Sequence, residues 1–248
     1  MAFISIEKVT KTYNDQSGSA AVPVLAELDA AISEGEFICL MGPSGSGKST
    51  VLTIVGAMNR PTHGKVIVDG IDVYALSDER RADFRREYIG FVFQQHHLMP
   101  YLDVLENVML PLATASISSR EKKERATSVL ERVGLADKAT RLPNQLSGGE
   151  QGRVAIARAL VNDPPLILAD EPSGTLDTRT GNEIMDVFRQ LNDQGQTIFM
   201  VTHNNENAAL AHRVLNIRDG ALVGEGRPQS DRGTSLTSGS PASLLTYE

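Results

Sequence analysis

The sequence contains very little cysteine and no tryptophan. Its 248 residues include one cysteine, Cys39. A single cysteine excludes a disulfide framework within the chain and fits a reducing compartment. Because Cys39 lies in an apolar segment, we expect it to be a small, buried hydrophobic residue.

Long apolar runs and an excess of basic residues are also absent. No run approaches the roughly 20 apolar residues that a membrane-spanning helix needs, and the first residues lack a secretory pattern. We therefore expect any membrane role to come from a partner chain. The 24 lysines and arginines face 31 acidic residues, so the net charge is −7. This balance lacks the basic footprint of nucleic-acid-binding proteins, and we expect no nucleic-acid partner.

What the sequence does contain is a glycine-rich segment at residues 42–49 that matches the phosphate-loop pattern G-x-x-x-x-G-K-[ST]. An apolar run at 36–41 precedes it and predicts a buried strand, and residues 49–55 can begin a helix. Backbone amides and a helix N-terminus would attract phosphate. Lys48 would reach the β- and γ-phosphates, and the Ser49 hydroxyl would ligate Mg²⁺. A glycine-rich turn that binds nothing is the alternative. The predicted nucleotide contacts are Gly42, Pro43, Ser44, Gly45, Ser46, Gly47, Lys48, Ser49 and Thr50.

Two adjacent carboxylates end a second apolar strand, predicted at residues 166–170. In phosphate-loop enzymes the first such carboxylate holds Mg²⁺, and the second is placed to polarise the attacking water. We assign Asp170 to the metal and Glu171 to the general base. A strand that runs into a solvated acidic turn is the alternative interpretation.

A third segment, at residues 146–151, has the groups for a second phosphate site. Ser147 offers a hydroxyl, Gly148 and Gly149 expose backbone amides, and an amphipathic helix is predicted to follow. A simple helix cap is the alternative. The segment resembles the LSGGQ signature of the ATP-binding-cassette (ABC) ATPases. That resemblance implies nucleotide contacts from Ser147, Gly148, Gly149, Glu150 and Gln151.

The remaining ABC elements occur in the expected order, and the resemblance covers roughly residues 3–225. It implies that Gln94 contacts Mg²⁺ or the attacking water, that Asp177 belongs to a loop crossing a dimer interface, and that His203 contacts the γ-phosphate. It also implies that Tyr13 stacks on adenine. Alternatively, His203 is an ordinary surface residue and Tyr13 a plain strand-end aromatic. Within the family, the sequence is similar to the lipoprotein-release and macrolide-export group (LolD/MacB type).

The resemblance implies an α/β fold, a P-loop NTPase of the ABC type with an inserted helical subdomain. We expect one domain over residues 1–248, with a core at 1–93 and 161–223 and a helical subdomain at about 94–160. In the latter, Val129, Leu130 and Val133 can form an apolar stripe. Residues 224–248 are rich in glycine, serine and proline, and predict a flexible tail.

The implied function is that of an ATP-hydrolysing motor subunit that uses ATP and Mg²⁺. Two chains would pair head to tail as a homodimer and power an integral membrane permease from the cytoplasmic face of the membrane. The alternative is a regulatory ABC ATPase that controls a membrane protein, such as a cell-wall hydrolase activator, without transport. A DNA-repair ABC ATPase is disfavoured, because residues 51–145 contain no long coiled coil.

An apolar and aromatic stretch at residues 96–102 leaves two interpretations open. It either packs the helical subdomain onto the core, or lines an exposed groove for a short cytoplasmic helix of the permease. The second would link the groove to Gln94, which lies directly before the stretch.

Overall fold

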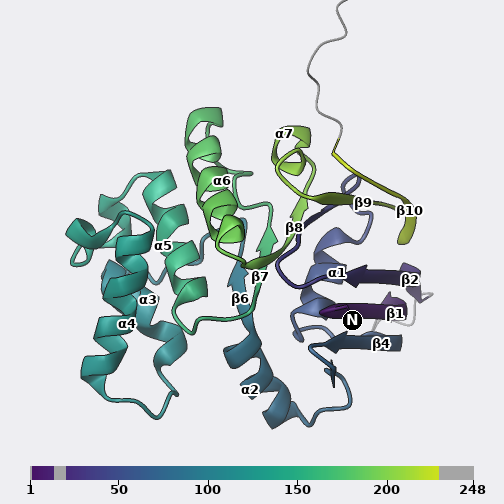
Figure 1. The fold of residues 1–248 in the computed structure, drawn as a ribbon, viewed down its shortest axis with the longest axis horizontal. Coiled ribbons are helices and arrows are strands. Elements are labelled where there is room, and N and C mark those ends of the chain that lie inside the picture. The colour runs from purple at the N-terminus through teal and green to yellow at the C-terminus, as the bar shows by residue number, and fades with distance from the viewer. Residues whose placement is uncertain (1, 14–20, 229–248) are drawn as a thin grey trace, which may run out of the picture.

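The computed structural model describes residues 2–13 and 21–228 (Figure 1). Its centre is a six-stranded sheet with the strand order β10-β9-β3-β8-β7-β6, in which β10 is antiparallel and the other five strands are parallel. The strands are β3 (Phe37–Met41), β6 (Ile89–Val92), β7 (Leu166–Asp170), β8 (Thr197–Thr202), β9 (Arg213–Arg218) and β10 (Ala221–Gly226). The predicted strands that flank the motifs are therefore present and parallel.

The central strands are buried on both faces, which explains why they are continuous apolar runs. In β3, Phe37 and Cys39 point into one hydrophobic cluster, whereas Ile38 and Leu40 point into another. This alternation follows from the two-residue period of a strand. Cys39 is fully buried, as expected.

Helices cover the face of the central sheet to which Phe37 and Cys39 point (Figure 1). They are α3 (Val104–Met109), α4 (Ser119–Arg132), α5 (Gly148–Leu160) and α6 (Thr178–Asp193), with the short 3₁₀ turns η1 (Leu110–Leu112), η2 (Ala136–Lys138) and η3 (Pro143–Gln145). The predicted stripe Val129, Leu130 and Val133 is buried in this cluster. The other face of α4 is charged and exposed, with ion pairs such as Arg120–Glu124 at 2.7 Å.

A second, antiparallel sheet of order β2-β1-β4-β5 covers the other face of the central sheet together with two helices. These elements are β1 (Ile4–Tyr13), β2 (Val22–Ile32), β4 (His63–Val68), β5 (Ile71–Asp72), α1 (Lys48–Val55) and α2 (Asp78–Tyr88). Helix α1 lies between the two sheets (Figure 1) and buries Val51, Leu52, Ile54 and Val55. The helix that follows the phosphate loop is thus packed against the central sheet on one side and the antiparallel sheet on the other. The last helix, α7 (Asn205–Ala208), follows β8.

The start of the predicted flexible tail at residue 224 is wrong. Residues 224–226 belong to β10, where Gly224 pairs with Asn216 and Glu225 with Leu215. The ladder hydrogen bonds and a 2.6 Å ion pair between Glu225 and Arg213 hold this segment to β9. Residues 229–248 of the predicted tail lie outside the described residues, and the other domain boundaries stay a prediction. Across 2–13 and 21–228, no helix is both long and apolar enough to cross a bilayer.

Candidate active site

The phosphate loop connects the end of β3 to the start of α1, and its backbone requires glycine at several positions. Gly45 and Gly47 have φ values of +78° and +99°, which disfavour any side chain. A Cβ on Gly42 would lie 2.2 Å from the Ile217 carbonyl oxygen and 2.8 Å from Ser46 Oγ. The sequence therefore folds here into a tight loop whose amides precede a helix N-terminus, which favours an anion.

Lys48, the first residue of α1, is held over this loop. Its side chain is buried, and Nζ donates to the carbonyl oxygens of Gly42 and Pro43, each at 2.9 Å. A buried ammonium needs such partners, because desolvating an unpaired charge is costly. The loop thus combines a fixed positive charge with the amides around it.

Ser49 and Asp170 supply oxygen atoms next to the loop. Ser49 Oγ donates to Asp170 Oδ1 at 3.2 Å, which joins the start of α1 to the end of β7. Burial raises the pKa of Asp170 and the charge of Glu171 adds to this rise, while the Ser49 hydrogen bond and Lys48 oppose it. A hydroxyl and a carboxylate fit Mg²⁺, which uses few protein ligands beside substrate phosphates. Among the described residues, no group of three His, Cys, Asp or Glu side chains is arranged to hold a metal ion.

The Glu171 carboxylate contacts two other predicted catalytic residues, His203 and Gln94. Its Oε1 lies 2.9 Å from His203 Nδ1, and its Oε2 accepts from Gln94 Nε2 at 3.4 Å. Its φ of +44° is in the left-handed region, and its N–H donates to the Val201 carbonyl oxygen at 2.9 Å. Backbone strain of this kind in a non-glycine residue is typical of functional sites.

Part of the loop, Lys48, Ser49, Glu171 and His203 line one cavity of about 620 Å³, whereas Asp170 and Gln94 do not line it and contact it only through Ser49 and Glu171. Tyr13 lies at its edge, 45% exposed, with its hydroxyl accepting from Asn59 Nδ2 at 2.6 Å and Lys11 Nζ 4.7 Å from its ring centre. An exposed aromatic face of this kind can stack on a base. The cavity is lined by Tyr13, Val24, Ser44, Gly45, Gly47, Lys48, Ser49, Thr50, Glu171 and His203.

The predicted signature residues lie elsewhere. Ser147 caps α5 in a capping box with Glu150, in which Ser147 N–H donates to Glu150 Oε2 at 2.7 Å. Hydrogen bonds from Lys138 and from Ser147 lower the pKa of Glu150 to about 2. Gln151 Nε2 donates to the carbonyl oxygens of Pro143 and Leu146 at 3.0 and 3.3 Å. Both long side chains therefore serve the local fold, and residues 147–151 do not line the cavity.

Asp177 is likewise outside the cavity and caps a helix. Its carboxylate accepts from the Thr180 N–H at 3.1 Å at the start of α6, and hydrogen bonds from the Thr180 side chain and from that N–H lower the pKa of Asp177. Sequence reasoning missed Val24 and Asn59, which belong to no motif and reach the site only through the fold.

A family profile described as "ABC transporter" matches residues 25–174. The chain belongs to the ABC transporter family. The matched range includes the phosphate loop, the capped start of α5 and the carboxylates after β7.

Relatives with known sequences extend this likeness over most of the chain. The ABC transporter ATP-binding protein YknY of Bacillus subtilis is 49% identical over 220 residues, which are 89% of this chain and 95% of YknY. The macrolide export ATP-binding/permease protein MacB of Syntrophobacter fumaroxidans is 46% identical over 91% of this chain but only 32% of MacB. The predicted likeness to the macrolide-export group is confirmed.

Solved structures agree. The ATP-binding cassette MJ0796, described as dimeric in a post-hydrolysis state bound to ADP and Pi, has a TM-score of 0.82 and 44% identity over 92% of this chain and 99% of its own. The α/β ABC fold and the ATPase activity predicted from the sequence are thereby confirmed. This ABC cassette binds and hydrolyses ATP.

Proposed function

We propose that this chain is the motor subunit of a transporter complex, in which two copies close head to tail on ATP and drive a membrane permease. The observation that carries the proposal is the separation of two phosphate-binding features within one chain. The cavity between the phosphate loop and His203 contains one of them. The exposed Ser147 at the start of α5 is the other, and it does not line that cavity.

A second copy would bring these two features together. The start of α5 offers backbone amides and a helix N-terminus, which attract an anion. It is a 13-residue helix, so its partial charge is well developed. Placed over the cavity of a partner chain, it would close on the γ-phosphate. The similar cassette MJ0796 is described as a dimer, which supports this arrangement.

The residues in the cavity, together with Gln94 and Asp170 next to it, have complementary roles in hydrolysis. Lys48 neutralises charge on the β- and γ-phosphates, and Glu171 accepts a proton from the attacking water. His203 and Gln94 orient the water and the γ-phosphate, since both contact the Glu171 carboxylate. Ser49 and Asp170 would hold Mg²⁺, which supplies charge neutralisation at the phosphate oxygens.

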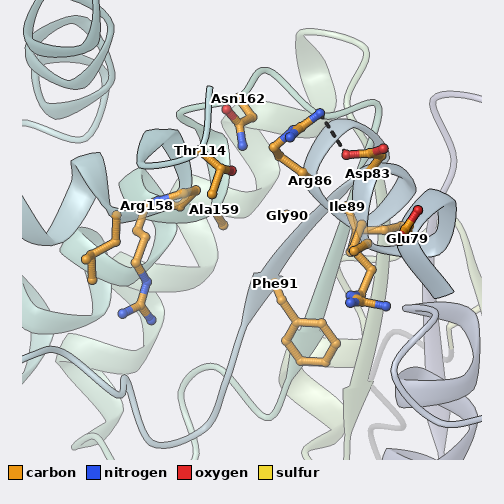
Figure 2. A pocket seen from close by; sticks show the side chains of 14 residues that line it. Glu79, Asp83, Arg86, Ile89, Gly90, Phe91, Thr114, Arg158, Ala159 and Asn162 are labelled. Carbon is orange, nitrogen blue, oxygen red and sulfur yellow. Dashed lines mark ion pairs between the residues drawn. The ribbon is translucent and has the colours of Figure 1, made fainter. Parts of the chain in front are cut away.

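The permease would dock in a groove of about 720 Å³ between the core and the helices (Figure 2). Helix α2 and β6 form one wall, with Phe91 at its base and the Asp83–Arg86 ion pair at its rim, 3.1 Å apart. The other wall includes Arg158 of α5, which donates to the His96 and His97 carbonyl oxygens at 2.6 and 2.8 Å. These two hydrogen bonds connect one wall of the groove to the segment that follows Gln94.

No residue of the stretch at 96–102 lines this groove, and the hydrogen bonds from Arg158 connect the two. Leu98 is half-buried against the hydrophobic core, as the packing interpretation expects. Met99 and Tyr101 are 48% and 91% exposed. Large apolar side chains that are exposed on the surface can mark a protein interface. We therefore assign Met99 and Tyr101 to the permease contact.

Changing Met99 or Tyr101 to Asp should weaken assembly with the permease at least about tenfold, because a charge would be buried in an apolar contact. The isolated ATPase should keep its basal rate. Assembly is measured by co-purification from detergent-solubilised membranes, and the rate by phosphate release. Val223→Asp is the control, since Val223 is 62% exposed on β10. Full assembly and coupled activity with Asp at both positions would put the groove contact elsewhere.

The same co-purification tests the proposed function as a whole. Mass spectrometry of the bound membrane chain would identify a permease if the chain is a transport motor. A membrane protein that controls a cell-wall hydrolase would instead favour the regulatory role. Either partner would hold the chain at the cytoplasmic face of the membrane.

A further inference from the structure

Asn207 is one of the few polar side chains buried in the described part of the chain. It lies in α7 and is 6% exposed. A buried amide costs little only when it is hydrogen-bonded. Asn207 Nδ2 donates to Ser173 Oγ at 2.7 Å, which joins two segments 34 residues apart. Asn207 belongs to none of the sequence motifs, whereas Ser173 belongs to the same loop as Asp177.

On one side of the contact, Ser173 lies in the turn that follows Glu171. The Glu171 carbonyl accepts from the Gly174 N–H at 2.9 Å, and the Ser173 carbonyl accepts from the Leu176 N–H at 3.1 Å. A shift of Ser173 therefore moves the backbone that carries Glu171. The φ of +44° at Glu171 persists only if its surroundings hold it.

On the other side, Asn207 belongs to a helix that begins two residues after His203. Asn204 caps that helix, because its Oδ1 accepts from the N–H groups of Glu206 and Asn207 at 2.7 and 3.3 Å. The Asn204 N–H donates to Thr202 Oγ1 at 3.0 Å. His203 thus lies between Thr202 and Asn204, which are hydrogen-bonded to each other. Because Asn204 also caps α7, the position of α7 constrains the His203 backbone.

We propose that Asn207 is a positioning residue for ATP hydrolysis. Its bond to Ser173 holds the turn with Glu171 against the turn with His203, so that the two side chains stay 2.9 Å apart. The proposal rests on the hydrolytic roles proposed above for Glu171 and His203. Misplacement by about 1 Å can cost about 10²-fold in rate, so losing one tether should cost about tenfold.

The test is a double-mutant cycle with Asn207→Leu, Ser173→Ala and the double variant, measured by steady-state phosphate release. Each single change should lower kcat about tenfold and leave the KM for ATP unchanged, since the phosphate loop is untouched. The double variant should lose no more than the worse single variant, because both changes remove the same bond. Asn205→Ala, at an exposed position of the same helix, is the matched control and should keep the wild-type kcat.

A Ser173→Ala variant with the wild-type kcat would overturn the proposal, and so would a double variant whose loss is the product of the single losses. If Asn207→Leu does not fold, Ser173→Ala decides alone, because it removes only one oxygen from a half-buried side chain. Glu171→Gln and His203→Ala, measured alongside, separate the two claims. Normal turnover in both would remove the roles proposed for those residues. Slow turnover in both, with normal turnover in Ser173→Ala, would remove only the role of Asn207.

Discussion

Replacing Glu171 with Gln should lower the ATP turnover by at least about 10²-fold while ATP binding persists. The amide has the same shape as the carboxylate but cannot take a proton from water. Gln keeps the contacts with Gln94 and His203 within reach, so the geometry of the cavity should be kept. ATP that is bound and not hydrolysed should then hold two chains together as a stable dimer. Phosphate release, nucleotide binding and sedimentation in ATP measure the three effects.

Glu183→Gln is the control for this change. Glu183 is a half-exposed carboxylate on α6, outside the cavity, and its loss should leave turnover near the wild-type value. Normal turnover in Glu171→Gln would show that another group activates the water.

Replacing Lys48 with Ala should reduce ATP affinity or turnover by at least about 10²-fold. The change removes the buried ammonium that lies over the loop, which we propose neutralises the charge of the β- and γ-phosphates. It also frees the carbonyl oxygens of Gly42 and Pro43, which accept from Nζ. Equilibrium nucleotide binding and phosphate release separate the loss of affinity from the loss of rate.

Lys65→Ala provides the matched control, because Lys65 is an exposed lysine on β4 outside the cavity. It removes the same charge from the chain without touching the loop. Wild-type affinity and turnover in Lys48→Ala would contradict the phosphate-loop assignment.

The central strands could be predicted because each is a continuous apolar run that carries a motif at its end. The antiparallel sheet was harder to predict. In β1 the pairing register shifts between Ile6 and Val9 and again up to Thr12, which breaks the simple alternation of buried and exposed residues. Strand β10 was hidden by its composition, since Gly224 and Gly226 have low strand propensity and the strand depends on its ladder with β9.

Within the site, residues that follow one another in a motif could be predicted, but their distant partners could not. The phosphate loop requires Lys48 and Ser49 at fixed positions, so sequence alone indicates both. The Lys138 partner of Glu150 and the Asn207 partner of Ser173 are surface-type residues outside any motif. Only the folded chain brings them together, which is why sequence reasoning missed them.

In the proposed dimer the signature of one chain closes on the phosphate loop of another, and engineered cysteines can detect that closure. Ser44 in the loop and Ser147 before α5 are both exposed. Each is changed to cysteine in a separate chain that also carries Glu171→Gln. The native Cys39 should not interfere, because burial raises its pKa to about 12 and the thiol stays protonated.

The measurement is disulfide formation in a mixture of the two cysteine chains, with and without ATP, followed by non-reducing electrophoresis. A disulfide requires Cα atoms within about 7 Å, so it reports close approach of these two sites. Head-to-tail closure should give a cross-linked dimer of one Ser44→Cys chain and one Ser147→Cys chain, formed only when ATP is present. No cross-link between these chains in ATP, with ATP binding intact, would contradict head-to-tail closure.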